Sequence, residues 1–163
     1  MVGIYERMDM DLLDAFKKII IALNEHRIEY ALCGGLAMAV YALPRATLDI
    51  DIMIEADSLD LTKQAVHDLG FILNAMPMEF QGGKVLMQRI SRIDSNSGEV
   101  FSLDLLIVTP ETRQAWESRF SVEWEGGVLS VVSPEGLIHL KSLRGSGQDQ
   151  DDIQYLRSIT DED

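Results

Sequence analysis

The sequence predicts an α+β domain in which helices flank a mixed β-sheet. Apolar residues recur at three- and four-residue spacings in some segments and at every second residue in others, and the two kinds of segment alternate along the chain. Glycine and proline stand between them. Because 163 residues is an ordinary length for one domain, we expect a core over residues 1–132 and a helical extension of the same domain over 133–163.

The first elements are predicted from apolar spacing and glycine. Residues Asp11–His26 place six large apolar side chains at helical spacing, which is typical of an amphipathic helix. A short apolar run at Tyr30–Cys33 predicts a strand, and Gly34-Gly35 ends it. The helix formers of Leu36–Ala42 then predict a second helix.

Strict alternation marks the next strand, at Leu48–Ile54. Ser58 is expected to cap a helix that runs through Leu69. Phe71–Asn74 then predicts a brief strand after Gly70.

A hairpin is expected from the two long apolar segments Val85–Ile93 and Val100–Val108, because the residues between them have the composition of a turn.

The last part of the chain contains two helix-start signatures, Thr109-Pro110-Glu111 and Ser133-Pro134-Glu135. Between these lies a second predicted hairpin, in which Phe120–Glu123 and Val128–Val132 flank a turn with two glycines. A final helix is predicted at Asp151–Ile159.

Charge and composition exclude several classes of protein. The 14 basic and 27 acidic side chains give a net charge of −13, which argues against a broad nucleic-acid surface. The uncharged stretch Tyr30–Leu43 is too short to span a bilayer. The start of the chain lacks the pattern of a secretory signal, and the single cysteine, Cys33, forms no internal disulfide. We therefore expect a cytoplasmic protein that does not enter membranes.

Three aspartates in apolar strands are the candidate chemical groups. Asp49 and Asp51 leave the same face of one predicted strand, and Asp104 lies inside another very apolar strand. If the two strands are neighbours, the three carboxylates converge, and a positive partner is expected because unneutralised acids repel there. Oxygen ligands of this kind suit Mg²⁺, and two such ions would clamp a phosphoryl group in transfer.

Gly34-Gly35 stands between a predicted strand and a predicted helix. Free backbone N–H groups at such a junction bind anions, although two glycines taken alone are more simply interpreted as a tight turn.

Taken together, these residues resemble the nucleotidyltransferase superfamily typified by DNA polymerase β-like enzymes. Cys33-Gly34-Gly35, then thirteen residues, then Asp49-Ile50-Asp51, and later Leu103-Asp104-Leu105 follow that family's pattern. The spacing of Arg45, Thr47, Asp49 and Asp51 is similar to a small bacterial branch that includes antibiotic nucleotidyltransferases and type IV toxin–antitoxin toxins. The resemblance covers residues 28–108 well and the C-terminal part more loosely.

The resemblance implies roles for these residues. Asp49, Asp51 and Asp104 would be catalytic and would bind Mg²⁺ that carries an NTP such as ATP, and Asp104 would also help deprotonate the attacking hydroxyl. Gly34 and Gly35 would bind the β- and γ-phosphates. Leu36 departs from the family, since many members have a phosphate-contacting serine at that place, although backbone N–H groups can do much of that work.

Two basic residues are further candidates for nucleotide binding. Arg45 either neutralises the acids or a phosphate, or it is a solvated residue after Pro44. Lys141 lies three residues before Arg144 and either reaches a triphosphate or belongs to a solvated helix face. We leave Lys84, Arg89 and Arg92 outside the site, because alternating strands often carry such charges.

The function implied is transfer of an NMP from an NTP to a hydroxyl of a small molecule, an RNA or a protein, with release of pyrophosphate. The alternative is a catalytically silent nucleotidyltransferase-like binding or regulatory module, such as a toxin–antitoxin component. Because few residues follow Asp104, we expect a homodimer or a partner subunit to complete the cleft.

Overall fold

The computed structural model describes residues 10–41, 49–125, 127–144 and 147–160. In these ranges the helices and strands alternate as an α+β fold. The strands are β1 (Ala31–Cys33), β2 (Asp49–Ile54), β3 (Leu73–Asn74), β4 (Met78–Phe80), β5 (Val85–Ile93), β6 (Val100–Ile107), β7 (Phe120–Trp124) and β8 (Gly127–Val131). The α-helices are α2 (Met10–Glu25), α3 (Gly34–Val40), α4 (Leu59–His67), α5 (Arg113–Glu117), α6 (Pro134–Arg144) and α7 (Gly147–Thr160).

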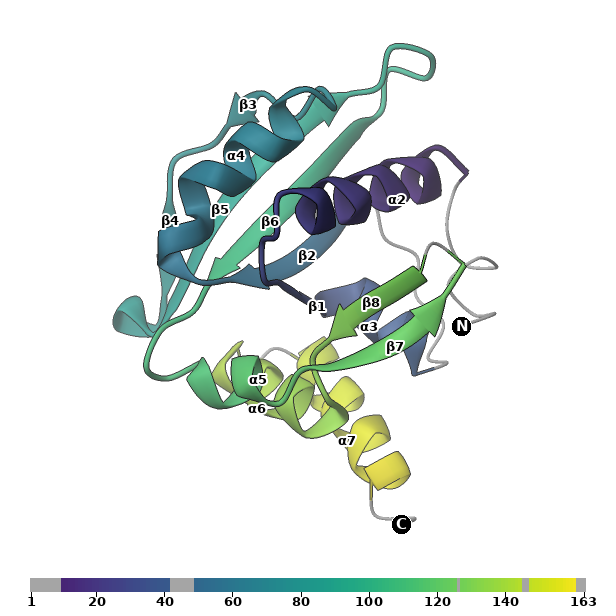
Figure 1. The fold of residues 1–163 in the computed structure, drawn as a ribbon. Coiled ribbons are helices and arrows are strands. Elements are labelled where there is room, and N and C mark those ends of the chain that lie inside the picture. Colours follow the sequence, from purple (N-terminus) through teal and green to yellow (C-terminus); the bar gives the residue numbers. More distant parts are fainter. Residues whose placement is uncertain (1–9, 42–48, 126, 145–146, 161–163) are drawn as a thin grey trace.

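All the described strands belong to one mixed sheet, in the order β3-β5-β6-β2-β1-β8-β7, with β4 also paired to β5. The long central strands β2 and β6 run parallel, whereas β5 and β6 form the predicted antiparallel hairpin. Figure 1 shows α2 and α4 over one face of this sheet, with α5, α6 and α7 gathered near β8. The predicted mixed sheet with flanking helices is confirmed.

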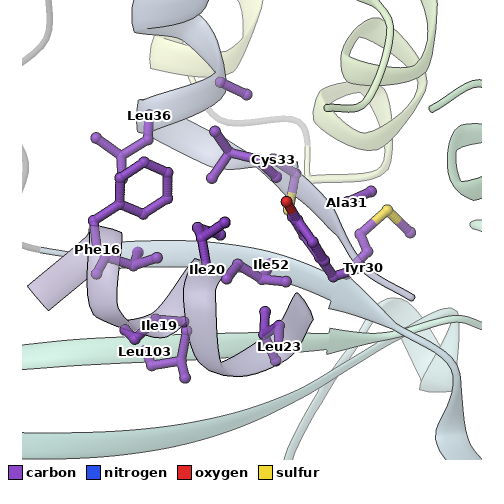
Figure 2. Close-up of a cluster of buried hydrophobic side chains, with 14 of the residues drawn as sticks. Phe16, Ile19, Ile20, Leu23, Tyr30, Ala31, Cys33, Leu36, Ile52 and Leu103 are labelled. Carbon is purple, nitrogen blue, oxygen red and sulfur yellow. The ribbon is translucent and has the colours of Figure 1, made fainter. Parts of the chain in front are cut away.

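The core lies between α2 and the sheet. Phe16, Ile19 and Leu23 of α2 have no exposed surface, because helical spacing places them on one stripe. Figure 2 shows this stripe clustered with Ile52 and Leu103 of the sheet. Each buried side chain of this size contributes roughly 1.5–3 kcal/mol. The same packing therefore fixes β2 and β6 side by side and leaves their other face for polar groups.

Several predicted boundaries were wrong. Ser58 does not cap α4 through its side chain, and instead its carbonyl accepts a hydrogen bond from Thr62 Oγ1 at 2.7 Å. The helix expected from Thr109 begins only at Arg113, because Thr109 and Thr112 bond to each other in a turn, with 2.9 Å between Thr109 N and Thr112 Oγ1. The edge strand β4 was not predicted at all.

The C-terminal helices are joined to each other by a buried ion pair. Ser133 caps the N-terminus of α6, since its hydroxyl accepts a hydrogen bond from Gly136 N at 3.0 Å. Lys141 Nζ of α6 lies 2.9 Å from Asp152 Oδ2 of α7, and both side chains are more than nine-tenths buried.

None of the described helices combines the length and apolar character needed to cross a bilayer.

Candidate active site

The register of the sheet brings the three predicted aspartates to one face. Asp51 on β2 lies directly beside Asp104 on the parallel strand β6, and Asp49 precedes Asp51 by two residues. Side chains two apart on a strand, or paired across neighbouring strands, point to the same side of a sheet. The core side chains of β2, such as Ile50 and Ile52, point the other way. The expected convergence of the carboxylates is therefore present.

The carboxylates repel one another in this partly buried place. The pKa of Asp51 is raised to about 7, mainly by burial and in addition by the charges of Asp104 and Asp49. Burial and Asp104 also raise the pKa of Asp49, against the lowering effect of Arg89. Two carboxyl groups that hold their protons unusually tightly indicate a site that favours an added positive charge.

Arg89 of β5 supplies a positive charge in this structure. Its Nε donates to Asp104 Oδ1 at 2.7 Å and its Nη2 donates to Asp104 Oδ2 at 2.9 Å, which is the bidentate geometry of a strong Arg–carboxylate pair. Arg89 Nη2 also lies 3.8 Å from Asp49 Oδ2. This hydrogen-bonded pairing raises the pKa of Arg89. The predicted positive partner of the acids is thus present within the sheet.

Arg89, which the sequence analysis left outside the site, lines the cleft and pairs with Asp104, and the predicted hairpin contained the signal for this position. If Ile93 and Val100 close the hairpin as neighbours, pairing backwards puts Arg89 opposite Asp104, as observed. Arg92 belongs outside the site, because its guanidinium lies on the other face, 5.5 Å from the ring centre of Phe71.

Gly34 follows β1 beside the acids and is the first residue of α3. Its φ of 66° lies in the left-handed region that favours glycine, and a Cβ atom at this position would collide with the carboxylate of Asp51. No other residue type fits there without displacing Asp51. Gly35 follows in the first turn of α3, and Leu36 is a buried core residue rather than part of the site.

The acids lie in a cleft of about 480 Å³ between the sheet and α6. Cys33 contributes to its lining, and burial raises the pKa of the Cys33 thiol well above its usual range. From α6, Lys141 and Arg144 also line the cleft, although Lys141 is held by Asp152 as well. Arg45, the other predicted basic residue, lies outside the described residues.

The donor set of the site fits a hard divalent cation such as Mg²⁺, which takes carboxylate oxygens. The raised pKa values of Asp49 and Asp51 indicate that a cation would relieve repulsion. Within the ranges that the structure describes, no three His, Cys, Asp or Glu side chains form a ready-made metal cluster. In the observed arrangement both oxygens of Asp104 are held by Arg89.

The fold is that of solved nucleotidyltransferase structures. A candidate nucleotidyltransferase from Thermotoga maritima matches with a TM-score of 0.60 and 14% identity, over 98% of this chain and 99% of that one. The antibiotic-resistance factor ANT(2'')-Ia matches with a TM-score of 0.55 and 17% identity, over 95% and 94% of the two chains.

An antigenic nucleotidyltransferase-like protein from Paracoccidioides brasiliensis matches with a TM-score of 0.54 and 21% identity, over 93% of this chain and 78% of that one. At such identities the likeness describes the fold and leaves activity to be argued from the site. No protein-family model matches the sequence, and no curated protein matches it.

Proposed function

We propose that this chain, which has the nucleotidyltransferase fold, transfers an NMP from an NTP to an acceptor hydroxyl in a metal-dependent reaction that releases pyrophosphate. The observation that carries the proposal is the meeting of Asp49, Asp51 and Asp104 on one face of the sheet, beside Gly34 and inside a cleft. Phosphoryl transfer depends mainly on positioning and charge neutralisation, and these residues can supply both.

Each group has a role in this proposal. Asp49, Asp51 and Asp104 would hold a divalent cation such as Mg²⁺, which when bound supplies the positive charge that neutralises the triphosphate. Asp104 would also accept the proton of the attacking hydroxyl, for which its carboxylate must first leave Arg89. Gly34 and Gly35 would present backbone N–H groups to the β- and γ-phosphates, since neither glycine has a side chain of its own.

Basic side chains of this chain would help to bind the phosphates of the NTP. Lys141 and Arg144 of α6 line the cleft, and their charges lower the pKa of Asp51 against the larger effects of burial and the neighbouring acids. Because Lys141 is also held by Asp152, it would act on the triphosphate by charge from a fixed position. Arg45 is proposed as a further phosphate ligand from the sequence pattern alone.

A second candidate function is a catalytically silent nucleotidyltransferase-like module, such as the binding or regulatory component of a toxin–antitoxin pair. The pairing of both Asp104 oxygens with Arg89 favours it, because this state is closed to a cation at Asp104. In either case we propose a cytoplasmic protein that acts with a second copy or a partner subunit. The domain boundary at residue 132 also stays a proposal.

A binding and transfer assay tests the enzymatic proposal. We expect calorimetry with Mg²⁺ to give heat for at least one NTP, and labelled NTP to mark an acceptor when the chain is incubated with cell extract. Asp49→Asn should weaken both signals at least tenfold, because Asp49 faces the site with about half of its side chain accessible. Asp68→Asn is the matched control, since that carboxylate is 95% exposed.

The outcomes separate the two candidate functions. Binding of an NTP without any labelled acceptor would support the silent module. Equal signals from wild type and Asp49→Asn would mean that the carboxylates take no part in NTP binding or transfer. No heat with any NTP would reject the enzymatic proposal and would leave only a silent module that binds a partner.

A further inference from the structure

The sheet face that carries the aspartates continues into an apolar wall. Register pairs Arg89 with Asp104, then Met87 with Leu106, then Val85 with Phe80 of β4, so these side chains share the face of the acids. Phe80, Val85, Met87 and Leu106 all line the cleft. Leu137 and Leu140 of α6 line it as well. One end of the cleft is therefore acidic and the other end is apolar.

The direction of the proposed reaction indicates which end of the cleft binds the leaving pyrophosphate and which end binds the acceptor. The strands that form the cleft follow each other as β1, β2, β6, β5 and β4, which puts Gly34 at one side and Phe80 at the other. In an in-line displacement the attacking hydroxyl approaches phosphorus opposite the leaving pyrophosphate. With the pyrophosphate proposed at Gly34, the acceptor must approach across Asp104 from the side of β5 and β4.

The charges along the cleft then define the class of acceptor. Among the described residues that line it, the carboxylates are Asp49, Asp51 and Asp104, and all three are engaged in the proposed reaction. Arg89 is two residues from Met87 and Asp104 is two residues from Leu106, so the ion pair of Arg89 and Asp104 borders the apolar wall. A polycationic acceptor would meet an ion pair and an apolar surface, and no unengaged carboxylate among these lining residues, whereas an uncharged or weakly anionic molecule would bury apolar area against the wall.

The turn that presents Phe80 is unusual in its backbone. Gln81, which also lines the cleft, has a φ of 54°, and Gly82 and Gly83 follow with φ of 67° and 89°. A left-handed conformation is uncommon for a residue with a long side chain, and such residues concentrate at binding sites. Phe80 itself keeps 45% of its surface exposed at this turn.

From this arrangement we infer that the acceptor is a small hydroxyl compound with an apolar or aromatic body and without clustered positive charge, seated against Phe80 and Met87. The inference rests on the proposed function and narrows its acceptor. Neighbouring strands are about 4.8 Å apart, so β4 lies roughly 14 Å from β2. That span accommodates one or two rings beyond the phosphate, which favours a small molecule over a macromolecule.

The inference is tested with two acceptor probes of opposite character. Chloramphenicol is an uncharged aromatic molecule with hydroxyl groups, and tobramycin is a polycationic one. ANT(2'')-Ia, one of the similar structures described above, is also known in complex with adenylyl-2''-tobramycin. Tobramycin is therefore the informative contrast. We expect calorimetry with Mg²⁺ and a non-hydrolysable NTP analogue to give heat for chloramphenicol and none for tobramycin.

A matched pair of variants locates the binding site of the probe. Phe80→Ala should weaken chloramphenicol binding about tenfold, because an aromatic contact is lost. Phe120→Ala should leave it unchanged, since Phe120 is 44% exposed but lies on β7 at the other edge of the sheet. Both variants should bind the NTP analogue as the wild type does, because neither residue belongs to the phosphate end.

Each remaining outcome counts against a defined part of the account. If the NTP analogue binds and tobramycin binds or accepts label, the acceptor class is wrong while the proposed function stands. If chloramphenicol binds equally to Phe80→Ala and wild type, or to neither, the apolar wall is not the acceptor site. If no NTP analogue binds to wild type, the proposed function fails, and this inference fails with it.

Discussion

Replacing Asp51 by asparagine is expected to lower nucleotidyl transfer by at least about 10³-fold, because the variant loses a central ligand for the cation that neutralises the triphosphate. The same replacement is expected to raise the free energy of unfolding at pH 8. Asp51 lies beside Asp104 and next to Asp49 on one strand, and asparagine keeps its shape while removing one of three repelling charges. Loss of activity with a gain of stability is typical of a functional residue.

The gain in stability should depend on pH in a defined direction. The pKa of Asp51 is raised to about 7 in the folded chain from 3.8, so the folded state binds the additional proton between these values. Stability of the wild type therefore falls as pH rises from about 4 to 7, and the full penalty is present above pH 7. The asparagine side chain of Asp51→Asn does not titrate, so the variant's advantage should be greatest at pH 8 and vanish near pH 4.

Thermal unfolding of wild type and Asp51→Asn across this range measures the effect. An advantage on the order of 2–4 kcal/mol at pH 8 corresponds to roughly 5–10 °C in Tm for a chain of this size. Asp68→Asn, which removes a 95% exposed carboxylate, should follow the wild type at every pH. If the stability of Asp51→Asn relative to wild type instead increased toward acid pH, Asp51 would be stabilised as an anion, contrary to this prediction.

Replacing Arg89 by glutamine is expected to destabilise the chain by about 2–4 kcal/mol in the absence of divalent cations. The carboxylate of Asp104 is 6% exposed, and it would lose the positive charge and the bidentate pairing of Arg89 while still lying beside Asp51, since a glutamine amide can replace at most one of the two hydrogen bonds. Millimolar Mg²⁺ should then raise the Tm of Arg89→Gln more than that of wild type, because the cation replaces the lost positive charge and stabilises the state that binds it.

Arg113→Gln is the matched control for this experiment. Arg113 also makes a close pair with a carboxylate, Glu55 at 2.8 Å, but both side chains are more than one-third exposed. Its loss should change stability little, because exposed ion pairs are screened by solvent, and should give no response to Mg²⁺ beyond that of wild type. An Arg89→Gln variant as stable as wild type, or one indifferent to Mg²⁺, would mean that the Arg89–Asp104 pair does not occupy a cation site.

Local patterns predicted the parts of the fold that depend on neighbouring residues. Alternation in β2 placed Asp49 and Asp51 on one face, and turn composition placed the hairpin of β5 and β6. Both depend on the two-residue period of a strand, which the sequence displays directly. Asp104 was identified because burying a carboxylate in an apolar strand costs free energy unless it has a partner. The sheet register then placed it beside Asp51.

The features that escaped prediction depend on pairing between distant segments. Strand β4 is three residues long and forms only because β5 offers it an edge, so its own sequence carries almost no signal. Arg89 looked like an ordinary charge on an alternating strand until the register set it against Asp104. Lys141 was expected to lie near a triphosphate or in solvent, and its buried pairing with Asp152 required the packing of α6 on α7.

The most direct test of cation binding by these three carboxylates uses Mn²⁺. Its binding is monitored by electron paramagnetic resonance in the presence of a non-hydrolysable NTP analogue. We predict that wild type binds Mn²⁺ in proportion to bound analogue and that Asp51→Asn loses this signal while remaining folded. Equal Mn²⁺ binding by wild type and Asp51→Asn would contradict the central claim of a cation site formed by Asp49, Asp51 and Asp104.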